Sequence, residues 1–147
     1  MILAGRIRAA LLRLIGRPES TGARGERLAA EWLVAHGYRI LGRNIRTGFG
    51  ELDIVADAPD GRTIVAVEVK SRVRRIDAPG ASRSVAPEAS VTSRKEAKLL
   101  RLLRTLVEAN HWHDRPKRID IIAVELDEKG GAQIRHFENA VRRSRAR

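Results

Sequence analysis

Residues 49–72, FGELDIVADAPDGRTIVAVEVKSR, place the strongest constraint on the fold of this chain. Residues 51–56 alternate polar and apolar side chains, and residues 63–70 are rich in β-branched side chains, so both segments are predicted to be strands. The segment between them contains Pro59 and Gly61, which favour a turn. The sequence therefore predicts a β-hairpin whose second strand is mostly buried.

Three charged residues lie within this predicted hairpin. Side chains alternate along a strand, so Glu68 and Lys70 share one face of the second strand. If the turn folds symmetrically, with Ala56 opposite Thr63, Asp53 is diagonal to Glu68 at a Cα separation of roughly 7–8 Å. Two carboxylates at that spacing can hold a cation. A second interpretation stays open, in which the acids and the lysine neutralise one another or lie in water at the sheet edge.

The order of motifs along residues 22–126 favours the cation-binding interpretation of Asp53 and Glu68. Asp53 followed by Glu68-Val-Lys70 resembles the PD-(D/E)XK signature of restriction-endonuclease-like nucleases. The wider order resembles the YraN-like family of uncharacterised proteins, which belongs to that superfamily and is similar to archaeal Holliday-junction resolvases. The resemblance implies an α/β domain with a restriction-endonuclease-like mixed β-sheet flanked by helices. It is carried by GERLAAEWL, GYRILGRNIRT, FGELDIVA, VAVEVKSR, a lysine-bearing helix and RIDIIAVEL.

The resemblance also implies a catalytic site for metal-dependent hydrolysis of phosphodiesters. Asp53, Glu68 and the backbone carbonyl of Val69 would bind Mg²⁺ or Mn²⁺, which polarises a phosphate and lowers the pKa of a bound water. Lys70 would orient that water or stabilise charge developing on the phosphate. Glu26 would add a further acid at the rim of the metal site. A first-turn acid stabilised by the helix dipole is the alternative interpretation of Glu26.

The charge of the chain favours a polyanionic partner. Lys and Arg number 29 against 18 Asp and Glu, which gives a net charge of +11 and a pI near 11.3. Such a balance is typical of proteins that bind nucleic acid or an acidic membrane surface. Aromatic residues make up only 3% of the chain, so contact with phosphates of duplex or branched DNA is favoured over base stacking. Arg46, Arg72 and Lys95 are predicted to make such contacts, although Arg46 could equally be an ordinary surface arginine.

Three function classes stay open: a nuclease, a nucleic-acid-binding module and a membrane-surface adaptor. Similarity to the resolvases implies branched DNA as the substrate and a homodimer if both strands are cut symmetrically. A nucleic-acid-binding module that keeps the fold without cleaving is the main alternative. A membrane-surface adaptor is a third reading, because residues 1–19, MILAGRIRAALLRLIGRPE, have an amphipathic helical pattern. That segment is too short and too often interrupted by Arg to span a bilayer, and it lacks a cleavage site, so we expect a cytoplasmic protein without stable membrane insertion.

The length of 147 residues indicates one domain, predicted over residues 20–138, with a basic tail at 139–147. The absence of cysteine excludes disulfides and thiolate metal sites. Further elements are predicted from periodicity and capping signals. The first is a helix that starts after Ser20 or Thr21, either of which could cap it, and stops at Gly37. A strand over 38–47 follows it, and a loop over 71–91 follows the hairpin. Next come a helix that starts with a capping box at Ser93–Glu96 and ends near Asn110, a strand over 118–126 parallel to the hairpin, and an edge strand over 133–137.

Overall fold

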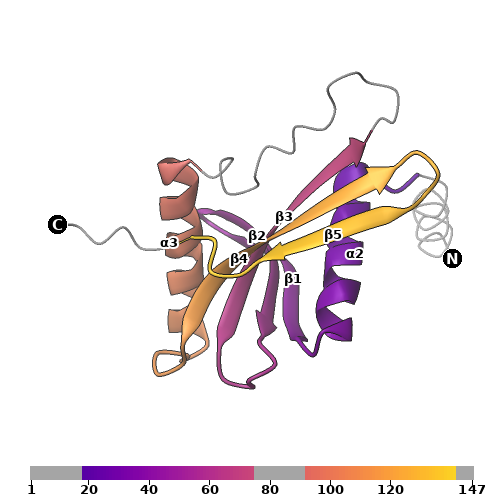
Figure 1. The fold of residues 1–147 in the computed structure, drawn as a ribbon. Coiled ribbons are helices and arrows are strands. Elements are labelled where there is room, and N and C mark those ends of the chain that lie inside the picture. The colour runs from indigo at the N-terminus through magenta and orange to yellow at the C-terminus, as the bar shows by residue number, and fades with distance from the viewer. Residues whose placement is uncertain (1–17, 75–91, 142–147) are drawn as a thin grey trace, which may run out of the picture.

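The computed structural model describes residues 18–74 and 92–141, which form a five-stranded mixed sheet with a helix on each face (Figure 1). The strand order is β1-β2-β3-β4-β5; β3 and β4 are parallel and the other neighbours are antiparallel. The predicted α/β class with a mixed sheet flanked by helices is therefore confirmed. The elements are α2 (Thr21–Ala35), β1 (Arg39–Thr47), β2 (Gly50–Asp57), β3 (Ile64–Arg74), α3 (Ser93–Ala109), β4 (Lys117–Asp127) and β5 (Ala132–Phe137).

Three predicted segments lie wholly or largely outside the described residues. They are the amphipathic N-terminal segment, most of the basic loop after β3, and most of the C-terminal tail. In the described part of the chain, no helix combines the length and the apolar character needed to cross a membrane.

The sheet separates two apolar clusters, one under each helix. Alternate side chains of a strand point to opposite faces, so each central strand supplies residues to both clusters. On one face, Ala29 and Leu33 of α2 pack with Val65, Val67 and Ile122. On the other face, a second set packs under α3, comprising Leu99, Leu102, Leu103 and Val107 of the helix with Ile64, Ala66 and Ile119 of the sheet. A residue's position along a strand therefore decides which helix it meets.

The helix ends agree with the capping signals in one case and differ by one residue in the other. Of the two predicted caps, Ser20 and Thr21, it is Ser20 that caps α2, with its hydroxyl accepting the Ala23 N–H at 3.1 Å. Gly37 follows the helix with φ +86°. The predicted cap at Ser93 is wrong. Thr92 caps α3, since it keeps an extended backbone and its hydroxyl accepts the Lys95 N–H at 3.4 Å.

The predicted register of the β2–β3 hairpin is also wrong. Ala56 lies opposite Val65, not Thr63. The turn closes with Ala58 opposite Thr63, where the Ala58 N–H donates to the Thr63 carbonyl at 2.9 Å. The Asp60 carboxylate holds this geometry, because it accepts the Thr63 N–H at 2.8 Å and the Thr63 hydroxyl at 2.6 Å. The change in register moves Asp53 relative to the second strand.

Strand β3 continues beyond the predicted end at Lys70 and ends at Arg74. Residues 71–74 were expected to begin a loop by composition. They pair instead in parallel with β4, as far as Arg74 opposite Asp127. The partner strand supplies the backbone hydrogen bonds that the local sequence does not indicate.

Candidate active site

Asp53 and Glu68 meet where β2 and β3 begin to separate. The observed pairing of these strands ends with Ile54 opposite Val67, and one further step in this register brings Asp53 level with Glu68. The Asp53 carboxylate accepts the backbone N–H of Val69 at 2.7 Å. The two predicted acids are therefore closer than the diagonal arrangement expected from a symmetric turn.

Two lysines converge on Glu68, whose side chain is 10% exposed. The Nζ of Lys70, from the same strand, lies 3.1 Å from Glu68 Oε1. The Nζ of Lys95 forms an ion pair with the same oxygen. Lys95 belongs to the first turn of α3, which Thr92 caps, so the start of that helix fixes the position of the second ammonium group.

The charges at this site leave Asp53 poorly stabilised as an anion. Burial raises the pKa of Asp53 to about 6, and the nearby charges of Glu68 and Glu26 add to the rise. The N–H of Val69 and the charge of Lys95 act in the opposite direction without cancelling it. Burial also lowers the pKa of Lys95, but its contact with Glu68 outweighs this, so the pKa ends above the usual value for lysine. The site therefore holds the firmly charged ammonium group of Lys95 beside a carboxyl that favours a proton or another cation.

A close approach of α2 to β3 places Glu26 near this site. A Cβ on Gly25 would overlap the hydroxyl of Ser71 and lie 2.6 Å from its Cβ. Glycine at this position is thus required for α2 to pack directly against β3. The contact is at Ser71, the residue after Lys70. The Gly-Glu pair in the sequence therefore combines a packing residue with an acid that faces the site region.

Asn44 and Glu51 join this region although the sequence did not single them out as site residues. Asn44 has φ +49°, a left-handed conformation that asparagine tolerates. When its side-chain amide is turned so that the nitrogen faces the acids, Asn44 can donate to Glu26 Oε2 at 2.8 Å and to Glu51 Oε1 at 3.2 Å. The only sequence signal was the spacing of Glu51, two residues before Asp53 on the same strand.

The donor set determines which ligands this site can take. Asp53 and Glu68 offer carboxylate oxygens, the ligand class that Mg²⁺ and Mn²⁺ accept. Within residues 18–74 and 92–141, no three His, Asp or Glu side chains are grouped tightly enough to enclose a metal ion. The chemistry of the oxygens fits a hard divalent cation, and that cation would compete with Lys70 and Lys95 for Glu68.

The two arginines predicted to contact phosphate form ion pairs with acids other than Asp53 and Glu68. The side chain of Arg46 is 81% exposed, and its Nε lies 3.2 Å from Glu51 Oε2. Arg72 pairs with Glu125 on β4. Their role in binding nucleic acid stays a prediction.

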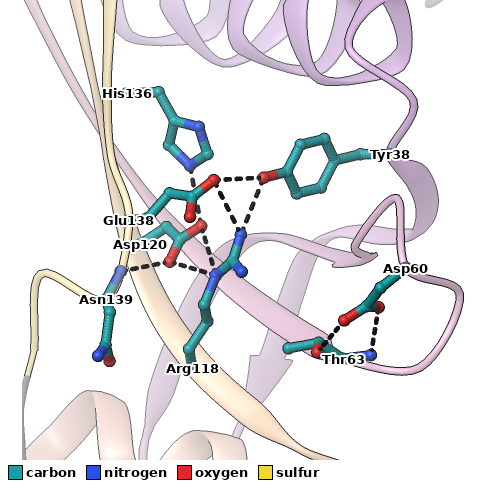
Figure 2. A network of polar contacts seen from close by, with 8 residues as sticks. All are labelled: Tyr38, Asp60, Thr63, Arg118, Asp120, His136, Glu138 and Asn139. Atoms are coloured by element: carbon teal, nitrogen blue, oxygen red, sulfur yellow. Dashed lines mark hydrogen bonds and ion pairs between the residues drawn. The ribbon is translucent and has the colours of Figure 1, made fainter.

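A separate polar network lies on the α2 face of the sheet (Figure 2). Asp120 is fully buried and accepts from Arg118 Nε at 3.0 Å and from the Asn139 backbone N–H at 2.8 Å. Its second oxygen lies 2.8 Å from His136 Nε2. Arg118 and Asp120 thus form an ion pair. The Arg118–Asp120 contact lies within β4, and the contacts of Asp120 with His136 and Asn139 tie β4 to the segment that follows it, so stabilisation of the fold accounts for this network.

A cavity of about 570 Å³ lies beside the C-terminal half of α3. Its walls include Leu103, Val107 and Ile119, with Arg104 and Lys117 among the polar lining residues. None of the predicted site residues lines it. The cavity is therefore distinct from the acids at the β2–β3 junction.

Comparisons with known proteins identify relatives over most of the chain. The model of a family described as "Uncharacterised protein family UPF0102" matches residues 25–124. A UPF0102 protein from Pelobacter propionicus is 43% identical over 126 residues, covering 84% of this chain and 85% of the relative. Another from Trichlorobacter lovleyi is 39% identical over 131 residues, covering 86% and 94%. A solved structure of SfsA from Pyrococcus furiosus in complex with Ca²⁺ is similar with a TM-score of 0.33 and 17% identity; the match covers 80% of this chain and 61% of that one.

Proposed function

The chain belongs to the uncharacterised protein family UPF0102, and we propose that it is a metal-dependent nuclease that hydrolyses phosphodiesters in DNA. One observation carries the proposal: Asp53, Glu68 and two lysines come together from β2, β3 and α3. The order of the motifs supports membership of the PD-(D/E)XK superfamily and a likeness to the archaeal resolvases. Branched DNA is the substrate class that this likeness favours.

The roles of the residues follow from their chemistry. Asp53, Glu68 and the carbonyl of Val69 would hold Mg²⁺ or Mn²⁺, with Glu26 as a further acid nearby. When bound, such an ion supplies a Lewis acid and a water of lowered pKa. Lys70 places an ammonium group beside these oxygens, where it can orient a water or stabilise negative charge on a phosphate.

The surface of α3 supports DNA as the partner. Lys95 lies at the site; the exposed cation Arg94 precedes it on the helix, and the exposed cations Lys98 and Arg101 follow it. In the described part of the chain, none of these three forms an ion pair with a carboxylate. Neighbouring cations without acidic partners repel one another along a helix, and bound phosphates relieve this repulsion. Contacts with phosphates position DNA on the protein without reading its base sequence.

A binding module without catalysis is the second candidate function, and a specific observation favours it. Glu68 already pairs with Lys70 and Lys95, which neutralise its charge without any metal. In this alternative, the same cationic surface binds DNA and the acids serve only to order the lysines.

Cleavage assays with Glu68→Gln test the proposal. Labelled duplex, flap and four-way-junction DNA are incubated with each protein in Mg²⁺, Mn²⁺ or EDTA. We expect wild-type cleavage that needs metal and is lost in Glu68→Gln. Glu125→Gln is the matched control, because the Glu125 side chain is 11% exposed and pairs with two cations, Arg72 and Arg135. Metal-dependent cleavage that survives in Glu68→Gln would refute the site, and binding without cleavage in any metal would favour the binding module.

A further inference from the structure

The tip of the β1–β2 hairpin presents an exposed aromatic ring. Phe49 is 45% exposed and, with Gly48, connects the paired residues Thr47 and Gly50. The Thr47 hydroxyl accepts the Phe49 N–H at 3.1 Å and donates to the Gly50 carbonyl at 3.4 Å. These bonds define the backbone of the tip from which the ring projects.

Helix α3 holds this tip from behind. The guanidinium of Arg101 lies over the Phe49 ring, 3.7 Å from its centroid. Gly50 has φ +144°, and a Cβ there would overlap Cε of Lys98, so the Lys98 side chain passes directly over the hairpin. The ring and the two cations form one surface, which we name the Phe49 platform (Phe49, Lys98 and Arg101).

The platform and the catalytic acids lie at the same end of the sheet. Phe49 precedes Asp53 by four residues, a distance of roughly 13 Å along an extended strand. Arg101 follows Lys95 by six residues, which is roughly 9 Å along the axis of α3. At roughly 3.4 Å per nucleotide step, the platform is about three to four steps of duplex from Asp53.

The fold alone does not account for the exposed ring. A cation–π contact at a solvent-exposed site contributes little to stability. A nucleobase, in contrast, stacks well on an aromatic ring backed by an arginine, and apolar side chains are used as wedges at disrupted base steps. In continuous duplex DNA the base faces are covered by their neighbours. They are open at a branch or at an end.

We propose that the Phe49 platform stacks on the base face exposed at a branch point of DNA and thereby sets the distance from the branch to the cleaved phosphate. Arg101 supports the ring, and Lys98 contacts the adjoining backbone phosphate. The proposal rests on the nuclease function above and specifies its substrate class. It also qualifies the scarcity of aromatic residues, because one placed ring is sufficient for one branch point.

Equilibrium binding in EDTA tests the platform without any cleavage. Wild type and Phe49→Ala are titrated with flap, four-way-junction, blunt-ended and hairpin-closed duplex DNA carrying 2-aminopurine beside the branch or end. We expect Phe49→Ala to bind branched DNA about 5- to 100-fold more weakly and to lose the fluorescence change, with closed duplex unaffected. Phe49→Trp should retain both. Equal losses on branched and closed DNA, or no loss on branched DNA, would overturn the proposal.

The matched control is Phe137→Ala on β5, at the opposite edge of the sheet from β1. Phe137 also lies near an arginine, with the Arg135 guanidinium 5.8 Å from its ring centroid. We expect this variant to bind all four DNAs like wild type. If Phe137→Ala weakens branched binding as much as Phe49→Ala, the effect is not specific to the platform and the proposal fails.

These binding measurements, together with the cleavage assays in Mg²⁺ and Mn²⁺ described above carried out on Phe49→Ala, separate the platform from the nuclease function. Phe49-dependent preference for branches without any cleavage would support the platform and refute the nuclease. Cleavage at unchanged positions in Phe49→Ala would support the nuclease and refute the platform. When both hold, Phe49→Ala should cut at scattered positions relative to the branch, and a protein that binds none of the DNAs would overturn both.

Discussion

Replacement of Asp53 by asparagine is expected to stabilise the protein above pH 7. Burial raises the pKa of Asp53 from 3.8 to about 6, so the ionised carboxylate is less favourable in the folded chain than in the unfolded chain. Asparagine has nearly the same shape and removes the charge. Its side-chain oxygen can still accept the N–H of Val69, which Asp53 binds at 2.7 Å.

The size and the pH dependence of this effect follow from the shift in pKa. A shift from 3.8 to about 6 corresponds to about 3 kcal/mol, and screening of the partly exposed carboxyl by water reduces this to about 1–2 kcal/mol. Because the folded-state pKa is raised, the carboxyl favours folding only when protonated, and this contribution is lost as the pH rises through about 6. The gain of Asp53→Asn should therefore be absent near pH 4 and level above pH 7, where Tm rises by about 2–8 °C for a chain of this length.

Thermal and urea unfolding followed by circular dichroism between pH 4 and pH 8 measures the difference. Asp60→Asn is the control with the opposite sign. Hydrogen bonds from Thr63 lower the pKa of Asp60 to about 2, so its carboxylate stabilises the fold above pH 4 and the variant should be less stable at pH 7. Mg²⁺ should raise the Tm of wild type at pH 7.5 and not that of Asp53→Asn. A loss of stability in Asp53→Asn at pH 8, or a gain that is independent of pH, would refute the reasoning.

Two further predictions concern packing and acid stability. Gly25→Ala should lower the free energy of unfolding in urea by about 1–3 kcal/mol, and Ser71→Gly should restore part of it, because the added Cβ overlaps the Ser71 side chain. Gly22→Ala in the same helix, where the Cβ meets nothing within 4 Å, should instead raise it by roughly 0.5–1 kcal/mol; equal effects of the two alanines would contradict the packing argument. Burial raises the pKa of Asp57, but its bonds to Arg39 and Arg115 lower the pKa by more, so the pKa lies below the usual value. The Asp57 carboxylate therefore stabilises the fold at neutral pH, and this stabilisation is lost in acid. The deficit of Asp57→Asn should therefore shrink from pH 7 towards pH 2, and a constant deficit would argue against these pairs.

Local patterns in the sequence predicted the elements, and contacts distant in the chain decided the details. The Ser20 cap and Gly37 bounded α2 correctly because both act within one turn of the helix. The cap of α3 was displaced by one residue because Thr92 and Ser93 are both able to cap. Strand β3 was predicted too short because its last residues depend on pairing with β4, which follows much later in the chain.

The candidate site was predictable where the hairpin alone brings residues together. Asp53 and Glu68 lie on adjacent strands joined by a short turn, so alternation and turn length were enough to place them on neighbouring positions. The register was in error because the hydrogen bonds of Asp60 select which residues close the turn. The contact of Arg101 with Phe49 could not be predicted, since it depends on how α3 lies across the hairpin.

A comparison of the buried Asp120 with the half-buried Asp53 shows why the acids at the β2–β3 junction require more than a structural explanation. Asp120 is fully enclosed, and both of its oxygens meet nitrogen partners, which compensates for the loss of water. Asp53 has one backbone N–H, and the neighbouring charges of Glu68 and Glu26 oppose its ionisation. A carboxylate that only stabilised the fold would be expected to resemble Asp120. The incomplete compensation of Asp53 is what a site requires if a divalent cation is to gain free energy by binding there.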